Sequence, residues 1–243
     1  MFQGITSLID YHVRALDGTV GSVSGFLFDD TSWFIRYVII DMPLNENGDV
    51  RKALIAPFSF GILNPETREL PLIEKKQKVE NSPPINLEMP FFHERQVELY
   101  KYYKWPPFNL DNMFHDVQTS GIKEYLNREE SVARSHLINT EKTIGYHLEA
   151  ADSEIGQVHD FIIDEEFWII RYISVDIGRN ISDKKVLIFP RDVKEVNPAE
   201  GKVFIDIIKD NVMNAPEYNP SLPMDREYEN TLHAYYGYPR YWD

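Results

Sequence analysis

The chain of 243 residues has no cysteine, no long apolar run and comparatively few basic residues. Without cysteine it can form no disulfide, no thiolate nucleophile and no cysteine-ligated metal site. No stretch approaches the ~18 apolar residues of a membrane-spanning helix. Residues 1–14 lack the basic and apolar regions of a secretory signal. These absences predict a cytoplasmic protein without a membrane span.

The charge balance limits the classes of molecule that the protein is expected to bind. The chain has 39 acidic residues against 25 basic ones, a formal net charge of −14. Nucleic acids and anionic lipids attract basic surfaces, so this balance argues against both as main partners. Apolar residues make up 43% of the chain and aromatic residues 13%. This content is sufficient for a buried core and argues against global disorder.

One line of the sequence occurs twice. Residues 33–41 are WFIRYVIID, and residues 168–176 are WIIRYISVD. When 11–41 is aligned with 146–176, thirteen of 31 positions are identical, where chance gives roughly two. The identical pairs are Tyr11/Tyr146, His12/His147, Ala15/Ala150, Asp17/Asp152, Gly21/Gly156, Val23/Val158, Phe26/Phe161, Asp29/Asp164, Trp33/Trp168, Ile35/Ile170, Arg36/Arg171, Tyr37/Tyr172 and Asp41/Asp176.

The repeat continues beyond this line. After the next loop the offset falls from 135 to 133 residues, so that Pro57 aligns with Pro190. Near the end of each copy, YYKWP aligns with YYGYP. The sequence is therefore a tandem repeat, with copies at 1–108 and 136–243 and a connection between them.

Each copy has the pattern of a β-domain. Short runs rich in Val, Ile, Phe, Tyr and Trp alternate with turn residues, and Asp17-Gly18 predicts a tight hairpin. Gly21 and Gly156 lie inside a strand pattern, which is typical of a bulge or sharp bend. Five or six strands of this length must hide their edges. The predicted fold is all-β, with one small antiparallel barrel in each copy.

A tail rich in proline and aromatic residues follows each predicted barrel. Apolar residues four positions apart predict short helices over about 93–103 and 226–236. We expect both arms to be ordered and docked on their own barrel, on the other barrel, or on a second subunit in a swapped homodimer. The predicted divisions are a first barrel at 1–80, an arm and linker at 81–135, a second barrel at 136–214, and a C-terminal arm at 215–243.

The stretches DGTVGSVSGFLFDDTSWFIRYVIID and DSEIGQVHDFIIDEEFWIIRYISVDIG resemble the PRC-barrel family. These are small β-barrels related to the cytoplasmic part of the photosynthetic reaction centre H chain. The tails also resemble those of bacterial proteins with tandem copies of this barrel. The resemblance implies an adaptor or assembly role without a catalytic motif. It also suggests a cytoplasmic regulator of a membrane photosynthetic or electron-transfer complex, although the H chain's membrane helix has no counterpart here.

Two arginines lie among apolar neighbours in the middle of predicted strands. Arg36 and Arg171 occupy equivalent positions, and a half-buried arginine needs a carboxylate partner. We expect structural ion pairs within each copy, with an anion or partner contact as the alternative. The candidate partners are Asp29 and Asp41 for Arg36, and Asp164 and Asp176 for Arg171.

Chemistry-bearing residues are few. His12 and His147 are equivalent but belong to separate copies, and no histidine has the spacing of a metal-binding pair. The acidic groups at 29–30 and 164–166 lie at predicted turns, where solvation is the ordinary role of such residues. No nucleophile motif is present. A metal-assisted hydrolase that uses these carboxylates and histidines is the enzymatic alternative, but we expect no enzyme, no cofactor and no metal.

The C-terminal aromatic residues are the candidate partner contacts, because aromatic side chains are enriched at protein interfaces. Packing within the chain is the alternative, and Trp33 and Trp168 are expected in the core. The function predicted from sequence is a protein-binding or assembly module, with the partner undefined and a homodimer left open. The candidate contact residues are Tyr235, Tyr236, Tyr238, Tyr241 and Trp242.

Overall fold

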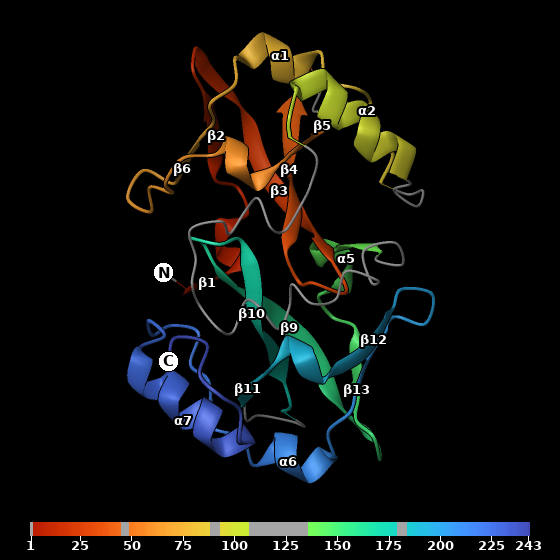
Figure 1. The fold of residues 1–243 in the computed structure, drawn as a ribbon, viewed down its shortest axis with the longest axis vertical. Coiled ribbons are helices and arrows are strands. Elements are labelled where there is room, and N and C mark those ends of the chain that lie inside the picture. The colour runs from red at the N-terminus through yellow and green to blue at the C-terminus, as the bar shows by residue number, and fades with distance from the viewer. Residues whose placement is uncertain (1, 45–48, 88–92, 107–135, 179–183) are drawn as a thin grey trace.

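Strands dominate the protein, as the sequence predicts. The computed structural model describes residues 2–44, 49–87, 93–106, 136–178 and 184–243. These residues form two sheets that follow one another along the longest axis of the molecule, with helices at each outer end (Figure 1). The first copy supplies most of one sheet, and the second copy supplies most of the other.

The order of elements is the same in the two copies, apart from one additional strand, β12, in the second. The strands of the first copy and its sheet partner β7 are β1 (Phe2–Gly4), β2 (His12–Ala15), β3 (Gly18–Asp29), β4 (Ile35–Pro43), β5 (Val50–Ile55), β6 (Glu69–Pro71) and β7 (Leu137–Asn139). The remaining strands are β8 (His147–Glu149), β9 (Glu154–Asp164), β10 (Ile169–Asp176), β11 (Lys185–Ile188), β12 (Val193–Asn197) and β13 (Lys202–Ile205). The helices are η1 (Ile5–Leu8), η2 (Pro57–Ser59), α1 (Lys76–Glu80), α2 (His93–Tyr103), α5 (Thr140–Thr143), η4 (Pro190–Asp192), α6 (Lys209–Met213) and α7 (Arg226–Tyr236).

The predicted antiparallel barrels are wrong in two respects, because the sheets are open and mixed. Their strand orders are β5-β4-β3-β2-β6 and β11-β10-β9-β8-β13-β12. Pro57 and Pro190 begin η2 and η4 two residues after the ends of β5 and β11, so these strands do not continue past them. The chain then crosses over and returns beside β2 or β8 in the same direction, and the resulting β2–β6 and β8–β13 pairs are parallel.

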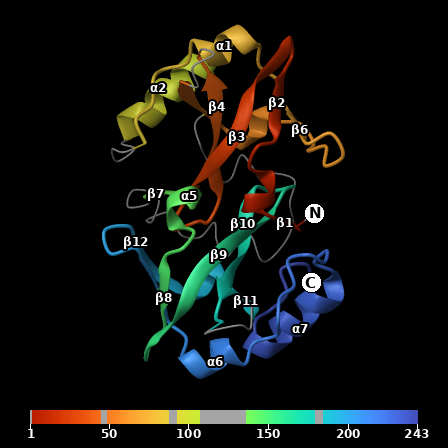
Figure 2. The same cartoon turned by 180° about the vertical axis from the view of Figure 1, so that it is seen from behind.

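The two copies exchange their first strands. β1 of the first copy pairs with β9 of the second, and β7 of the second copy pairs with β3 of the first. The registers are equivalent, with Gly4 opposite Ile162 and Asn139 opposite Leu27. Figure 2 shows β7 and α5 beside the end of β3, with which β7 pairs. The boundaries of the sheets therefore differ from the boundaries of the repeat.

The tryptophans of the repeated line lie where the copies meet. Both have a left-handed backbone, with φ of 62° at Trp33 and 52° at Trp168, which is uncommon for a bulky residue. The Ile35 amide donates to the Trp168 carbonyl at 2.8 Å, and the Ile170 amide donates to the Trp33 carbonyl at 2.9 Å. This backbone conformation directs each carbonyl group to the opposite copy, so the interface fixes it.

Two glycines allow close strand contact at equivalent places. A Cβ atom at Gly21 would collide with the carbonyl oxygen of Asp41, and one at Gly156 would collide with that of Asp176. Register shifts lie beside both glycines in the β2–β3 and β8–β9 pairs. These register shifts agree with the bulge or sharp bend that the sequence pattern indicated.

The two arms contain helices at the predicted positions, α2 and α7. Leu99 and Leu232 are equivalent and almost fully buried. Leu232 packs in a cluster with Tyr172, Leu187 and Phe189, which belong to its own copy. The Asp225 side chain caps the first turn of α7, and Gly237 ends the helix with φ of 72°. In the described part of the chain each arm helix lies on its own copy, and strands β1 and β7 cross between copies.

Candidate binding grooves

Each outer end of the molecule has an open groove between two helices. In the first copy, the groove lies between the turn after β2, helix α1 and helix α2, and its volume is about 620 Å³. The Asp17 carboxylate accepts a hydrogen bond from the Lys76 amide at 2.7 Å, which fixes the hairpin against the start of α1. The Tyr102 hydroxyl donates to the Lys78 carbonyl at 2.7 Å and joins α2 to α1. We call this the α1 groove.

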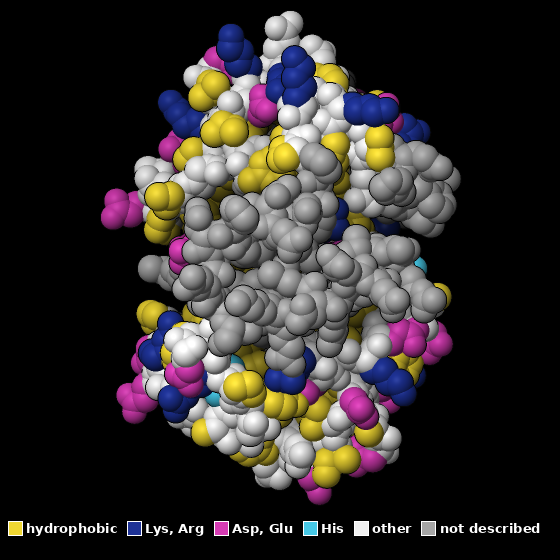
Figure 3. All heavy atoms as spheres, in the orientation of Figure 1, with side chains coloured by type: hydrophobic (Ala, Val, Ile, Leu, Met, Phe, Trp, Pro, Cys, Tyr) yellow, Lys and Arg dark blue, Asp and Glu magenta, His cyan; other side chains and the backbone are white. Residues whose placement is uncertain are grey.

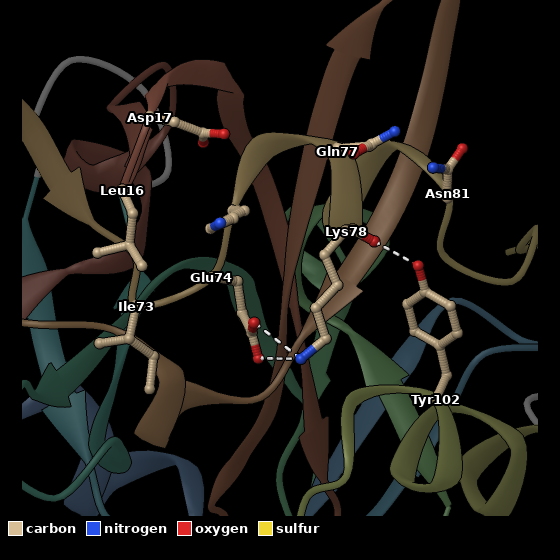
Figure 4. Close-up of a pocket in the computed structure, with 9 residues that line it drawn as sticks. Leu16, Asp17, Ile73, Glu74, Gln77, Lys78, Asn81 and Tyr102 are labelled. Atoms are coloured by element: carbon tan, nitrogen blue, oxygen red, sulfur yellow. Dashed lines mark hydrogen bonds and ion pairs between the residues drawn. The ribbon is translucent and has the colours of Figure 1, made fainter.

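The α1 groove has an apolar side and a polar side. Leu16 and Ile73 lie next to each other and are 69% and 59% exposed (Figure 4). Lys78 forms an ion pair with Glu74 at 2.8 Å across the floor of the groove (Figure 4). Exposed leucine and isoleucine side chains that adjoin one another are typical of a protein-binding surface.

The second copy has an equivalent groove, which we call the α6 groove, with a volume of about 520 Å³. The same contacts build it, since Asp152 accepts from the Lys209 amide at 2.8 Å and Tyr235 donates to the Asn211 carbonyl at 2.7 Å. The exposed apolar side chains are different. Here Ile208 is 49% exposed and Tyr235 is 41% exposed.

Charge distinguishes the two ends. The sequence has 11 basic and 14 acidic residues in 1–106, against 11 and 20 in 136–243. On the face in Figure 3, Lys and Arg gather over the upper end, and Asp and Glu are more numerous over the lower half. Equivalent backbones therefore present different surfaces to a partner.

The structure places the two arginines in buried ion pairs. Arg36 Nη1 lies 3.2 Å from Asp29 Oδ2, and Arg171 Nη2 lies 3.2 Å from Asp164 Oδ2. All four residues are at most 7% exposed. Breaking such a pair would leave a buried charge, which is strongly destabilising. A structural role accounts for these contacts.

The other two candidate carboxylates lie elsewhere. Asp41 pairs with Lys52 at 2.6 Å and accepts from the Ser24 hydroxyl, also at 2.6 Å. Asp176 accepts from the Gly178 amide at 3.0 Å. Both are the last residues of the repeated line, five residues after the arginines, so their side chains reach a different part of the sheet from the arginines.

A buried polar network under α7 was missed by the sequence reasoning. The Tyr172 hydroxyl donates to Glu229 at 2.7 Å and lies 3.3 Å from His233 Nε2. The Tyr241 hydroxyl donates to Glu229 at 2.9 Å, and Arg226 pairs with the same carboxylate at 2.9 Å. Burial, followed by the charge of Glu229, raises the pKa of Tyr172, and burial lowers the pKa of His233.

The signal for this network was present in the sequence. Glu229 and His233 are four residues apart, so they lie on the same face of a helix as the buried Leu232. The equivalent residues in the first copy are Gln96 and Tyr100, and Gln96 accepts from Arg36 at 3.4 Å. The second copy therefore has a carboxylate and an imidazole at positions where the first copy has an amide and a phenol.

The C-terminal aromatic residues mostly pack within the chain. Tyr236 donates to the Leu187 carbonyl at 3.1 Å, and Tyr238 donates to Asp192. Burial raises the pKa of Tyr238 to about 12. Trp242 packs on His233, with ring centroids 5.0 Å apart. Of this set, Tyr235 is the exposed residue that lines the α6 groove.

The histidines and acidic groups form no common centre. His12 is exposed on β2, and His147 lies 3.0 Å from Glu154 on the surface. Asp30 is near His136, at 3.3 Å, and Glu165 accepts from Gln3 of the other copy. Among the described residues, no group of three or more histidine, aspartate or glutamate side chains could hold a metal ion.

Comparisons with known proteins do not assign the chain to a family. No protein-family model matches it, and a search of curated proteins gives no match. Within the described ranges, none of the helices has the length and apolar character needed to cross a membrane.

Proposed function

We propose that the protein is a non-enzymatic assembly module that binds other proteins through the grooves at its two ends. The observation that carries this proposal is the pair of equivalent open grooves, each with exposed apolar side chains beside polar ones. Isolated exposed apolar residues are ordinary, but adjoining ones over a hollow favour a protein partner.

The arrangement of the grooves supports a bridging role. They lie at opposite ends of the longest axis, over α1 and α2 at one end and over α6 and α7 at the other (Figure 1). Two partners could therefore bind without contacting each other. The resemblance to the PRC-barrel family favours the same class of function. We propose that the chain belongs to this family, on the basis of the similar stretches at residues 17–41 and 152–178.

A site-specific crosslinking experiment tests the proposal. A photo-crosslinking residue replaces Ile73 or Ile208 in the full chain, and a matched control replaces Lys194, an exposed residue of β12 outside both grooves. The proteins crosslinked in extracts of the native cell are identified, purified and tested for binding to the unmodified chain. We expect crosslinks at the groove positions and not at Lys194, together with direct binding that Leu16→Ser or Ile208→Ser weakens. Equal crosslinking at all three positions, or none, would contradict the proposal.

A further inference from the structure

The two grooves have complementary edges. The segment after β6 is Ile73-Glu74-Lys75, and the equivalent segment after β13 is Asp206-Ile207-Ile208. Ile73 is 59% exposed and Lys75 is also exposed, whereas Asp206 is exposed and Ile208 is 49% exposed. The exposed apolar residue and the exposed charge have thus exchanged places between the two ends.

We propose that the α1 groove of one molecule binds the α6 groove of a second copy, head to tail. This inference rests on the proposed binding role of the grooves and names one partner for them. When the two edges run antiparallel, Ile73 faces Ile208 and Lys75 faces Asp206. The contact removes apolar area from water and pairs opposite charges.

Two edges of the same kind, from two molecules, do not match each other. In an antiparallel pairing of two α1 edges, Ile73 would face Lys75, and two α6 edges would set Asp206 against Ile208. Each such pairing places a charge on an apolar side chain, which costs desolvation without a compensating partner. The pattern therefore selects the contact between unlike ends.

Neighbouring side chains extend the match. Leu16 flanks Ile73 in the α1 groove, and Tyr235 flanks Ile208 in the α6 groove. Within the described part of the chain, neither Lys75 nor Asp206 has an ion-pair partner of its own. Both charges are thus available to a second molecule.

The geometry of the ends sets the form of the assembly. Because the grooves lie at opposite ends of the long axis, repetition of the contact produces an open row of molecules (Figure 1). The few side chains involved indicate a small interface, so we expect association in the micromolar range or weaker. The charge pair makes the association weaker at high salt.

Charge reversal in the full-length protein tests this contact by sedimentation velocity over a concentration series. Wild type is expected to form dimers and longer oligomers as concentration rises. Lys75→Glu and Asp206→Lys should each weaken association by at least about tenfold, because like charges then face each other. An equimolar mixture of the two variants should regain it, since each chain then offers the end that the other lacks. Lys194→Glu and Glu66→Lys are controls with the same charge changes at exposed sites away from both grooves.

The outcomes separate this contact from the general binding role. Wild type that stays monomeric into the millimolar range, or variants that fail to complement in the mixture, would overturn the head-to-tail contact. Crosslinks from Ile73 to a different protein would then leave the proposed binding function in place. Circular dichroism melting establishes that each variant is folded before its mass is interpreted.

Discussion

A single hydroxyl group connects the exchanged strand to its host sheet. Thr140 follows β7 directly, and it is 1% exposed. Its Oγ1 accepts from the Phe26 amide at 3.2 Å and donates to the Phe26 carbonyl at 3.3 Å. Phe26 belongs to the first copy, so these two bonds continue the β7–β3 ladder between copies. Thr140→Val keeps the shape of the side chain and removes both bonds.

The expected cost follows from the two backbone groups left behind. A hydrogen bond contributes about 1 kcal/mol, and a buried backbone group without a partner costs about 1–3 kcal/mol. We therefore expect Thr140→Val to lower the free energy of unfolding by about 2–4 kcal/mol. Thr140→Ser is the matched control, because it keeps the hydroxyl and loses one methyl group, at about 1 kcal/mol. Urea unfolding followed by circular dichroism measures both, and equal stabilities of the valine and serine variants would refute the role of the hydroxyl.

Three further predictions concern the core, the arm and pH. Trp33→Ala should lower the free energy of unfolding by about 3–5 kcal/mol, as for a buried aromatic residue, and an unchanged melting curve would place Trp33 outside the core. Truncation after Asn214 should lower the melting temperature, because it uncovers Tyr172, Leu187 and Phe189. If the truncated protein keeps the wild-type melting temperature and the same oligomeric mass in solution, the arm is a free tail. His233 has a folded-state pKa below its ordinary value of 6.5, so its contribution to stability is present above that pH and is lost as the pH falls. We expect the melting temperature to fall more steeply from about pH 7 to about pH 5 in wild type than in His233→Gln, and parallel curves would contradict this sign.

Local patterns in the sequence predicted local structure well. The hairpin at Asp17, the register shifts at Gly21 and Gly156, and the arm helices follow from residue types and spacing alone. The repeat itself predicted that the two copies share one order of elements. These features depend on near neighbours, which a single sequence displays.

Long-range pairing could not be predicted in the same way. Nothing in residues 2–4 or 137–139 states which sheet they join, because either copy offers a strand of the same register. Barrel closure was inferred from the need to hide edges, but the exchanged strands and the arms cover part of those edges instead. The grooves were missed because Leu16 and Ile73 are far apart in sequence and meet at the end of the sheet.

The exchange of strands bears on how the protein could have originated. In this chain the first strand of each copy pairs with the sheet of the other copy, so a single-copy ancestor with the same pairing would be complete only as a symmetric homodimer. Joining two such genes turns that dimer into one chain and releases it from symmetry. Positions that a homodimer must keep identical can then diverge, as Gln96 and Tyr100 have from Glu229 and His233. The same freedom allows the two ends to acquire opposite surfaces, which symmetry would have forbidden.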